Sequence, residues 1–141
     1  MMNTHDEIRL MGDRAQEASR AMVGLGARRK NAILQAMADA IERRRENIGE
    51  ANRLDVEAGR QGGLTPALVD RLTLTPARID GMIQGLREIA ALPDPVGRCI
   101  GRRRRPNGLV ILKRRVPIGV IAIVYESRPN VTADAAALCL K

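Results

Sequence analysis

The sequence has almost no aromatic side chains, and this shortage limits both its core and its functions. It contains no Trp or Phe, and Tyr125 is the only Tyr among 141 residues. Proteins that bind single-stranded nucleic acid stack bases on several aromatic rings, so this chain lacks the usual platform. A core without aromatics must be built from Leu, Ile, Val, Met and Ala, several of which are strong helix formers. Composition therefore predicts a helix-rich globular protein.

Histidine and cysteine are scarce as well, which argues against a metal centre and a disulfide framework. His5 is the only histidine, and Cys99 and Cys139 have neither CxxC nor Cys/His ligand spacing. We therefore expect no metal site and two reduced cysteines that act as packing residues. No apolar run approaches about 18 residues, and the chain does not open with a basic stretch followed by an apolar one. The sequence thus predicts a cytoplasmic protein with no membrane association.

Acidic residues are outnumbered, and the chain carries a formal net charge of +8. Proteins that recognise nucleic acid normally combine such charge with stacking aromatics or a recognition module, and neither is present. Nucleic acid is therefore not the expected partner, and most of the charge is expected on solvated helix faces. The alternative that stays open is a basic helical interaction module that binds nucleic acid or a sister subunit. Its phosphate-neutralising groups would be the basic runs Arg28–Lys30, Arg43–Arg45, Arg102–Arg105 and Lys113–Arg115.

Apolar residues at spacings of three and four predict helices in the first half of the chain. Thr4 and Glu7 have the spacing of a capping box, so the first helix should start at Thr4. A second apolar stripe predicts one helix that continues past the basic run 43–45. The members of this stripe are Ile33, Leu34, Met37, Ile41 and Ile48.

Two Thr-Pro pairs mark the starts of two further helices. Thr65-Pro66 and Thr75-Pro76 each offer an N-cap followed by proline at the first helical position. These signals predict a short helix over 66–73 and a longer one from 76 to about 91. Pro93 and Pro95 then prevent any continuation of the helix. The apolar positions of the longer helix are Ile79, Met82, Ile83, Leu86 and Ile89.

Pro106-Asn107-Gly108 separates two stretches, 98–105 and 109–116, and predicts a β-hairpin arm. Asn-Gly favours the positive backbone angles of a tight turn. An isolated hairpin is marginally stable in water, so the arm is expected to lean on another surface. Two interpretations stay open: a homo-oligomer contact with a partner subunit, and a solvated hairpin on the same subunit that is protected by its charge.

Residues 118–125 are apolar on both alternating faces apart from Gly119, a pattern typical of a central strand in a parallel sheet. One strand cannot form a sheet. Exposure of its six largest apolar side chains to water would cost on the order of 10 kcal/mol, which is comparable with the stability of a whole domain. We therefore interpret the chain as the opening part of a larger enzyme.

The loop from Glu126 to Asn130 follows the predicted strand, where α/β proteins place their ligands. Asn130 or Thr132 could cap the next helix, and Arg128 offers a positively charged fork for an anion. The GxGxxG fingerprint is absent, which argues against an ordinary Rossmann phosphate loop.

At this loop the sequence resembles the gamma-glutamyl phosphate reductases, also called glutamate-5-semialdehyde dehydrogenases, of the aldehyde dehydrogenase superfamily. The most specific part is the Tyr125–Asn130 loop joined to Ala135–Lys141. The resemblance covers almost the whole chain. Its upstream segments are Ala51-Asn52, Gly63-Leu64, Leu68–Leu72, Arg78-Ile79, Gly85–Arg87, Leu92–Gly97 and Arg105–Leu109.

The resemblance implies an oxidoreductase that reduces L-glutamate 5-phosphate to L-glutamate 5-semialdehyde with NADPH and releases phosphate, in proline biosynthesis. In the family, a cysteine thiolate attacks the acyl phosphate, and the thioacyl enzyme is then reduced. That cysteine lies beyond residue 141, and neither Cys99 nor Cys139 matches it. The chain alone is therefore expected to be inactive.

The same resemblance assigns candidate site residues in the loop. Asn130 is the nearest equivalent of the asparagine that donates to the developing oxyanion in aldehyde dehydrogenases. Four neighbours are expected to bind the cofactor or to line the acyl-phosphate pocket: Glu126, Ser127, Arg128 and Pro129.

The expected fold class is α/β, in three parts. Residues 1–97 would be the N-terminal helical part of the cofactor domain, and residues 98–117 the hairpin arm. Residues 118–141 would be the first strand, loop and helix of an aldehyde-dehydrogenase-like, Rossmann-type dinucleotide fold, which is incomplete in this chain.

Overall fold

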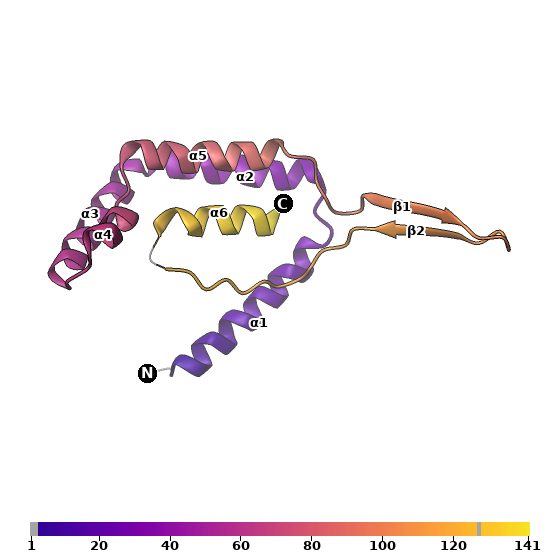
Figure 1. The fold of residues 1–141 in the computed structure, drawn as a ribbon, viewed down its shortest axis with the longest axis horizontal. Coiled ribbons are helices and arrows are strands. Elements are labelled where there is room, and N and C mark those ends of the chain that lie inside the picture. Colours follow the sequence, from indigo (N-terminus) through magenta and orange to yellow (C-terminus); the bar gives the residue numbers. More distant parts are fainter. Residues whose placement is uncertain (1–2, 127) are drawn as a thin grey trace. The chain divides into compact units, whose positions relative to one another are not determined.

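The computed structural model describes residues 3–126 and 128–141 and is rich in α-helix, as composition predicts (Figure 1). Contacts divide the chain into two compact units. We call residues 1–27 and 93–122 the hairpin unit, and residues 28–92 and 123–141 the helical unit. The elements in chain order are α1 (Thr4–Met22), α2 (Ala27–Arg43), α3 (Arg45–Gln61), α4 (Pro66–Leu72), α5 (Pro76–Ala91), β1 (Cys99–Arg104), β2 (Val110–Arg114) and α6 (Pro129–Leu140).

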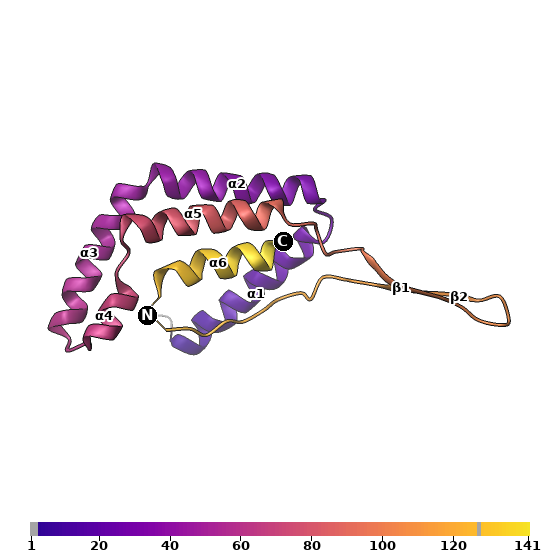
Figure 2. The ribbon, with the colours of Figure 1, turned by 45° about the horizontal axis from the view of Figure 1, so that its top comes forward.

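The core of the helical unit lies where α2, α5 and α6 run side by side (Figures 1 and 2). Leu34 of α2 and Leu86 of α5 are its fully buried large side chains. Alanine on each of the three helices removes bulk at the contact and lets the helix backbones approach. The apolar stripe predicted for residues 76–91 therefore does face a core. The buried cluster comprises Leu34, Ala38, Ile79, Ile83, Leu86, Ala90 and Ala137.

The two Thr-Pro signals are confirmed. Thr65 caps α4, because its Oγ1 accepts from the backbone N–H of Leu68 at 3.4 Å. Thr75 caps α5 by accepting from the backbone N–H of Arg78 at 3.2 Å. Each proline then stands at the start of its helix, where its missing N–H has no intrahelical partner to lose.

The predicted start of the first helix at Thr4 is confirmed, but its cap and the course of the second helix differ from the prediction. The cap of α1 is Asn3 and not Thr4, because the Oδ1 of Asn3 accepts from the backbone N–H of Asp6 at 2.9 Å. The predicted second helix is two helices, because the backbone at Arg44 leaves the helical region with φ −107° and ψ 15°. Three consecutive arginines gave no sign of this break, since arginine is a good helix former.

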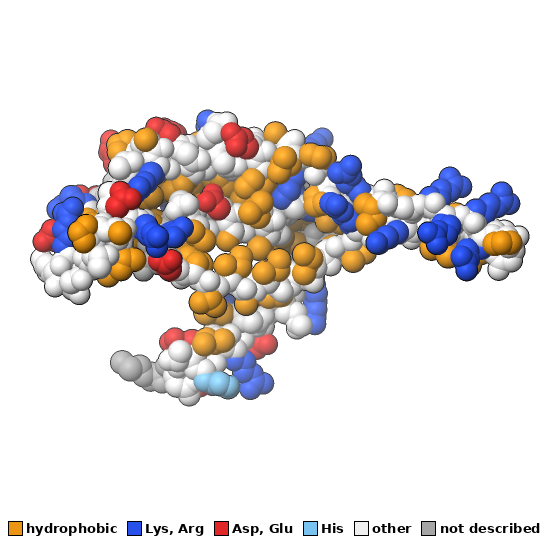
Figure 3. Space-filling model, viewed as in Figure 1, with side chains coloured by type: hydrophobic (Ala, Val, Ile, Leu, Met, Phe, Trp, Pro, Cys, Tyr) orange, Lys and Arg blue, Asp and Glu red, His pale blue; other side chains and the backbone are white. Residues whose placement is uncertain are grey.

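The predicted hairpin is confirmed, with a different turn. β1 and β2 pair antiparallel, with Arg102 opposite Leu112 and Arg104 opposite Val110. Gly108 has φ +86°, but no residue other than glycine has a positive φ among those described. The N–H of Gly108 donates to Arg105 O and that of Arg105 to Leu109 O, which makes a three-residue loop that ends in a left-handed glycine. Both strands are solvent-exposed throughout, and Lys and Arg side chains lie along them (Figure 3).

Residues 118–125 differ from the predicted buried strand. Residues 115–126 belong to no assigned helix or strand, and Val124 is 100% exposed. A strand is held by hydrogen bonds to a neighbouring strand, and within the described residues β1 and β2 pair only with each other. The α-rich fold with a two-stranded sheet is therefore what the structure contains, and the Rossmann-type sheet stays a prediction. The predicted division of the chain into three parts, residues 1–97, 98–117 and 118–141, also stays a prediction.

Candidate functional site

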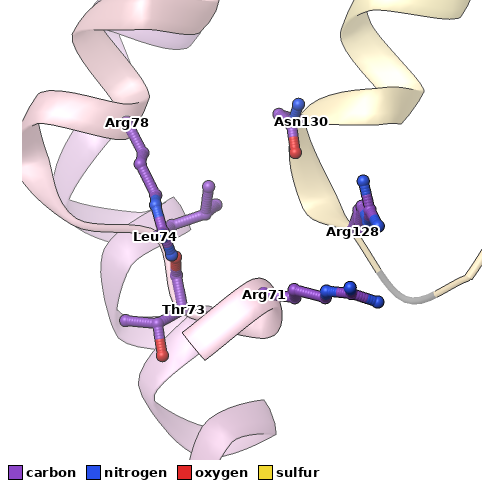
Figure 4. A pocket seen from close by; sticks show the side chains of 6 residues that line it. All are labelled: Arg71, Thr73, Leu74, Arg78, Arg128 and Asn130. Atoms are coloured by element: carbon purple, nitrogen blue, oxygen red, sulfur yellow. The ribbon is translucent and has the colours of Figure 1, made fainter. Parts of the chain in front are cut away.

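A pocket of about 350 Å³ in the helical unit brings the predicted loop together with the connection between α4 and α5 (Figure 4). Its walls come from the end of α4, the start of α5 and the start of α6. Among the lining residues, arginines supply all the formal charge, and there is no carboxylate. The lining residues are Arg71, Thr73, Leu74, Arg78, Arg128 and Asn130.

Asn52 of α3 fixes the connection between α4 and α5. Its side chain is 6% exposed. Its Nδ2 donates to Leu72 O at 2.8 Å, and its Oδ1 accepts from the backbone N–H of Leu74 at 2.7 Å. A buried amide thus satisfies a carbonyl and an N–H that have left the helices. The pocket wall at Thr73 and Leu74 is held in one geometry as a result.

Arg78 is a structural wall of the pocket. Its Nη1 donates to Asp70 O and to Thr73 O, the latter at 2.8 Å, and its Nη2 donates to both carboxylate oxygens of Asp70 at 3.0 and 3.2 Å. Most of its donors are therefore used within the protein. Arg78 locks the end of α4 to the start of α5 and has little capacity left for a ligand.

Arg71 and Arg128 are joined by one carboxylate. Arg71 Nη1 donates to Glu126 Oε2 at 3.3 Å, and Arg128 Nη2 lies 3.6 Å from Glu126 Oε1. All three side chains are about half exposed. The segment before α6 thereby places a carboxylate between two guanidinium groups that come from different elements. Figure 4 shows the Arg71 side chain extending from α4 toward the Arg128 side.

The start of α6 differs from the prediction, since neither Asn130 nor Thr132 caps the helix. The N-cap is Arg128, which makes no side-chain cap hydrogen bond, and Pro129 is the first helical residue. Asn130 lies within the first turn, where its Nδ2 donates to Asp134 Oδ2 at 3.2 Å. The Thr132 hydroxyl is 2.6 Å from the Tyr125 hydroxyl.

Of the predicted site residues, the structure brings Arg128 and Asn130 into the pocket and pairs Glu126 with Arg128. Pro129 is partly buried at the start of α6, and Ser127 lies outside the described residues. Sequence reasoning missed Arg71 and Arg78. A local signal existed only for Arg78, because a basic side chain close to the end of a helix can bond to its last carbonyls, as Arg78 does at the end of α4. The partner of Arg71 is Glu126, which is distant in the sequence.

The pocket can bind an anion and orient it, but its lining includes no cysteine that could act as a nucleophile. Cys99 and Cys139 are free and exposed, so the prediction that they act as packing residues is wrong. Across residues 3–126 and 128–141, no group of three or more His, Cys, Asp or Glu residues could hold a metal ion. No helix in the same residues is long and apolar enough to cross a membrane.

Comparisons with known proteins agree on one enzyme. No protein-family model matches the sequence. Gamma-glutamyl phosphate reductase of Moorella thermoacetica is 55% identical over 140 residues, which are 99% of this chain and 34% of that protein.

Two crystal structures of enzymes with the same name superimpose closely. The protein from Thermotoga maritima has a TM-score of 0.85 and 44% identity, over 91% of this chain and 31% of that one. The protein from Saccharomyces cerevisiae has a TM-score of 0.89 and 30% identity, over 99% of this chain and 35% of that one. The chain thus spans about a third of the length of these relatives. In sequence and in fold, at least 91% of the chain is similar to about a third of each of these gamma-glutamyl phosphate reductases.

Proposed function

We propose that the chain acts as the N-terminal part of an NADPH-dependent reductase that converts L-glutamate 5-phosphate to L-glutamate 5-semialdehyde in proline biosynthesis. The observation that carries this proposal is the 55% identity to the Moorella enzyme across 140 of the 141 residues. Such identity along a whole chain makes a shared fold and a shared role the simplest explanation. The comparisons do not favour a basic module that binds nucleic acid.

In this proposal the loop before α6 and the start of α6 face the reacting groups. Asn130 donates from its side chain to the developing oxyanion, for which its Nδ2 would leave Asp134. Glu126, Ser127, Arg128 and Pro129 contact the cofactor or the acyl phosphate. The pocket suits such ligands, because its guanidinium groups match the charge of their phosphate groups. NADPH, when bound, supplies the hydride.

Further parts of the proposal concern the chain as a whole. The nucleophilic cysteine comes from outside these 141 residues, so the chain alone does not turn over substrate. The hairpin β1–β2 contacts a partner subunit, and the enzyme is cytoplasmic. The division into a helical part (1–97), an arm (98–117) and the first unit of a dinucleotide fold (118–141) belongs to the same proposal.

A chimera tests the function. The chain replaces the matching third of the Moorella enzyme, and the oxidation of glutamate 5-semialdehyde by NADP⁺ and phosphate, the reverse reaction, is followed through NADPH absorbance. We expect activity from the chimera and none from the 141-residue chain alone. A chimera that folds and assembles like the Moorella enzyme but is inactive would contradict the proposal.

The role of Asn130 is tested in the same chimera. Asn130→Ala should lower kcat by about a hundredfold, the usual cost of one oxyanion donor. Asn130→Asp is the matched variant, since it keeps the size of the side chain but removes the amide donor. An unchanged kcat in Asn130→Ala removes this residue from the oxyanion role and leaves the function of the whole chimera in place.

A further inference from the structure

The two arginines that flank Glu126 keep most of their hydrogen-bond donors unused. Within the described residues, the only side-chain hydrogen bond of Arg71 goes to Glu126. The Arg128 guanidinium has only the 3.6 Å ion pair to the same carboxylate. A guanidinium has five N–H donors. Both residues line the pocket, so most of their donors remain available to a ligand there.

Arg78 provides an internal comparison for these two residues. It lines the same pocket, but its donors are taken by Asp70 and Thr73 through four contacts. In the lining, most N–H donors of Arg78 are therefore bonded within the protein, whereas among the described residues the side chains of Arg71 and Arg128 pair only with Glu126. The difference marks Arg71 and Arg128 as the groups available to an incoming anion.

Glu126 occupies the position that an anion would take between the two arginines. Its two carboxylate oxygens face one guanidinium each, at 3.3 and 3.6 Å. The side chain is 57% exposed and lies in a segment without helix or strand structure. Exposed ion pairs of this kind contribute little to stability, so exchange of this carboxylate for another anion costs little.

We propose that Arg71 and Arg128 form a clamp for a phosphate group, and that Glu126 is a resident counter-ion that leaves when the phosphate binds. A phosphate presents several oxygens and more charge than one carboxylate, and arginine forks bind it through paired N–H···O bonds. The source of the phosphate rests on the proposed function: it is either the acyl phosphate of the substrate or a phosphate group of the dinucleotide.

Binding of inorganic phosphate to the 141-residue chain tests the clamp without any need for catalysis. A ³¹P NMR titration at constant ionic strength, balanced with NaCl, measures the affinity. Arg71→Ala and Arg128→Ala should each weaken binding about tenfold or more, as expected for loss of a hydrogen bond to a charged group. Glu126→Gln should tighten binding, because it removes the competing charge and keeps the shape of the side chain.

Two further variants make the titration decisive. Arg53→Ala removes an exposed arginine that is also paired with a glutamate and does not line the pocket, so it should leave phosphate binding unchanged. Arg71→Lys keeps the charge but loses the fork, and should give an intermediate affinity. Circular dichroism checks that each variant is folded. Equal losses in Arg53→Ala and Arg71→Ala, or weaker binding in Glu126→Gln, would overturn the clamp.

The chimera then distinguishes the two sources of phosphate. In the reverse reaction inorganic phosphate is itself a substrate, so Arg71→Ala raises KM for phosphate if the clamp holds the acyl phosphate. It raises KM for NADP⁺ if the clamp holds the dinucleotide. An active chimera in which neither KM changes refutes the clamp but supports the proposed function. If the chimera is inactive but the 141-residue chain binds phosphate through Arg71 and Arg128, the clamp is supported and the proposed function is refuted.

Discussion

At the scale of single residues, the geometry of the site depends on a side chain that never contacts the pocket. Asn52 comes from α3, and its amide ties together Leu72 and Leu74 at 2.8 and 2.7 Å. Thr73 lies between these two anchored residues, and Arg71 directly precedes the first of them. A buried amide that satisfies one carbonyl and one N–H is far more specific than an apolar contact, because its loss leaves both backbone groups unpaired.

Asn52→Ala should therefore destabilise the helical unit by about 1 to 3 kcal/mol, since two partly buried backbone groups lose their partners. Urea denaturation followed by circular dichroism measures the free energy of unfolding. Asn47→Ala is the matched control, because Asn47 is an exposed asparagine on the same helix. If the two variants unfold at the same urea concentration, the two hydrogen bonds of the Asn52 side chain do not contribute to stability.

A surface pair of α3 makes a prediction about pH. Arg53 donates to both carboxylate oxygens of Glu50, at 2.7 and 3.0 Å. These hydrogen bonds, and then the charge of Arg53, lower the pKa of Glu50 below its ordinary value of 4.5. A carboxylate with a lowered pKa contributes stability above its ordinary pKa, and this contribution disappears as the pH falls through the lowered value.

Carboxyl-carbon NMR titration should find the pKa of Glu50 below that of free glutamate, and Arg53→Gln should return it to the ordinary range. The control is the pKa of Glu50 in Arg87→Gln, which removes an arginine that pairs instead with Asp39. A pKa of Glu50 that is the same with and without Arg53 would show that the pair does not persist in solution.

At the scale of elements, the sequence predicts the helices and the turn whose first or last residues have a marked local preference for a cap or a turn. Thr65-Pro66 and Thr75-Pro76 fix the starts of α4 and α5 because the threonine accepts a helical N–H and proline has none to offer. Gly108 fixes the hairpin turn because its φ is +86°. These effects act within a few residues, so sequence alone is sufficient to find them.

Thr75→Ala should cost about 1 kcal/mol of stability, the usual effect of losing an N-cap acceptor. Thr75→Ser keeps the hydroxyl and should stay close to the parent protein. Because Arg78 at this helix start is also a pocket wall, the alanine variant should bind phosphate more weakly than the serine variant. Thermal denaturation and the phosphate titration measure the two effects. Identical melting of both variants would mean that this cap does not support α5.

Elements that depend on distant partners could not be predicted in the same way. The break at Arg44 has no glycine or proline, and its geometry separates α2, which packs on α5, from α3, which contacts α4. The apolar run of residues 118–125 indicates a preference for strand, but a preference does not supply the neighbouring strand. The Arg71–Glu126–Arg128 arrangement joins residues 55 positions apart, and no local pattern encodes that contact.

At the scale of the whole molecule, stability rests on a small aliphatic core. Leu86 is fully buried in the cluster shared by α2, α5 and α6, whereas Leu138 of α6 is 61% exposed. Leu86→Ala should destabilise the protein by about 2 to 5 kcal/mol through lost burial and the cavity left behind. Leu138→Ala should have only a small effect on the urea midpoint. Equal midpoints for the two variants would place the core elsewhere.

The segment 116–125, which follows the hairpin, is a stretch of exposed apolar side chains. Ile118 is 85% exposed and Val124 is 100% exposed. Contiguous apolar surface of this kind binds the dye ANS, whereas scattered apolar residues do so weakly. Ile118→Ser with Val124→Ser should lower ANS fluorescence and leave the unfolding free energy nearly unchanged, because neither side chain belongs to the buried cluster.

The matched control is Ile8→Ser with Val23→Ser, which changes two residues of similar exposure, 64% and 62%, outside this segment. It should change the fluorescence much less, because these residues lie far apart in the sequence and do not form one continuous strip. If both double variants reduce ANS binding equally, the dye does not recognise the segment. If the first variant also lowers the free energy of unfolding by several kcal/mol, residues 118–125 are buried in solution, as expected for the strand that the sequence predicts.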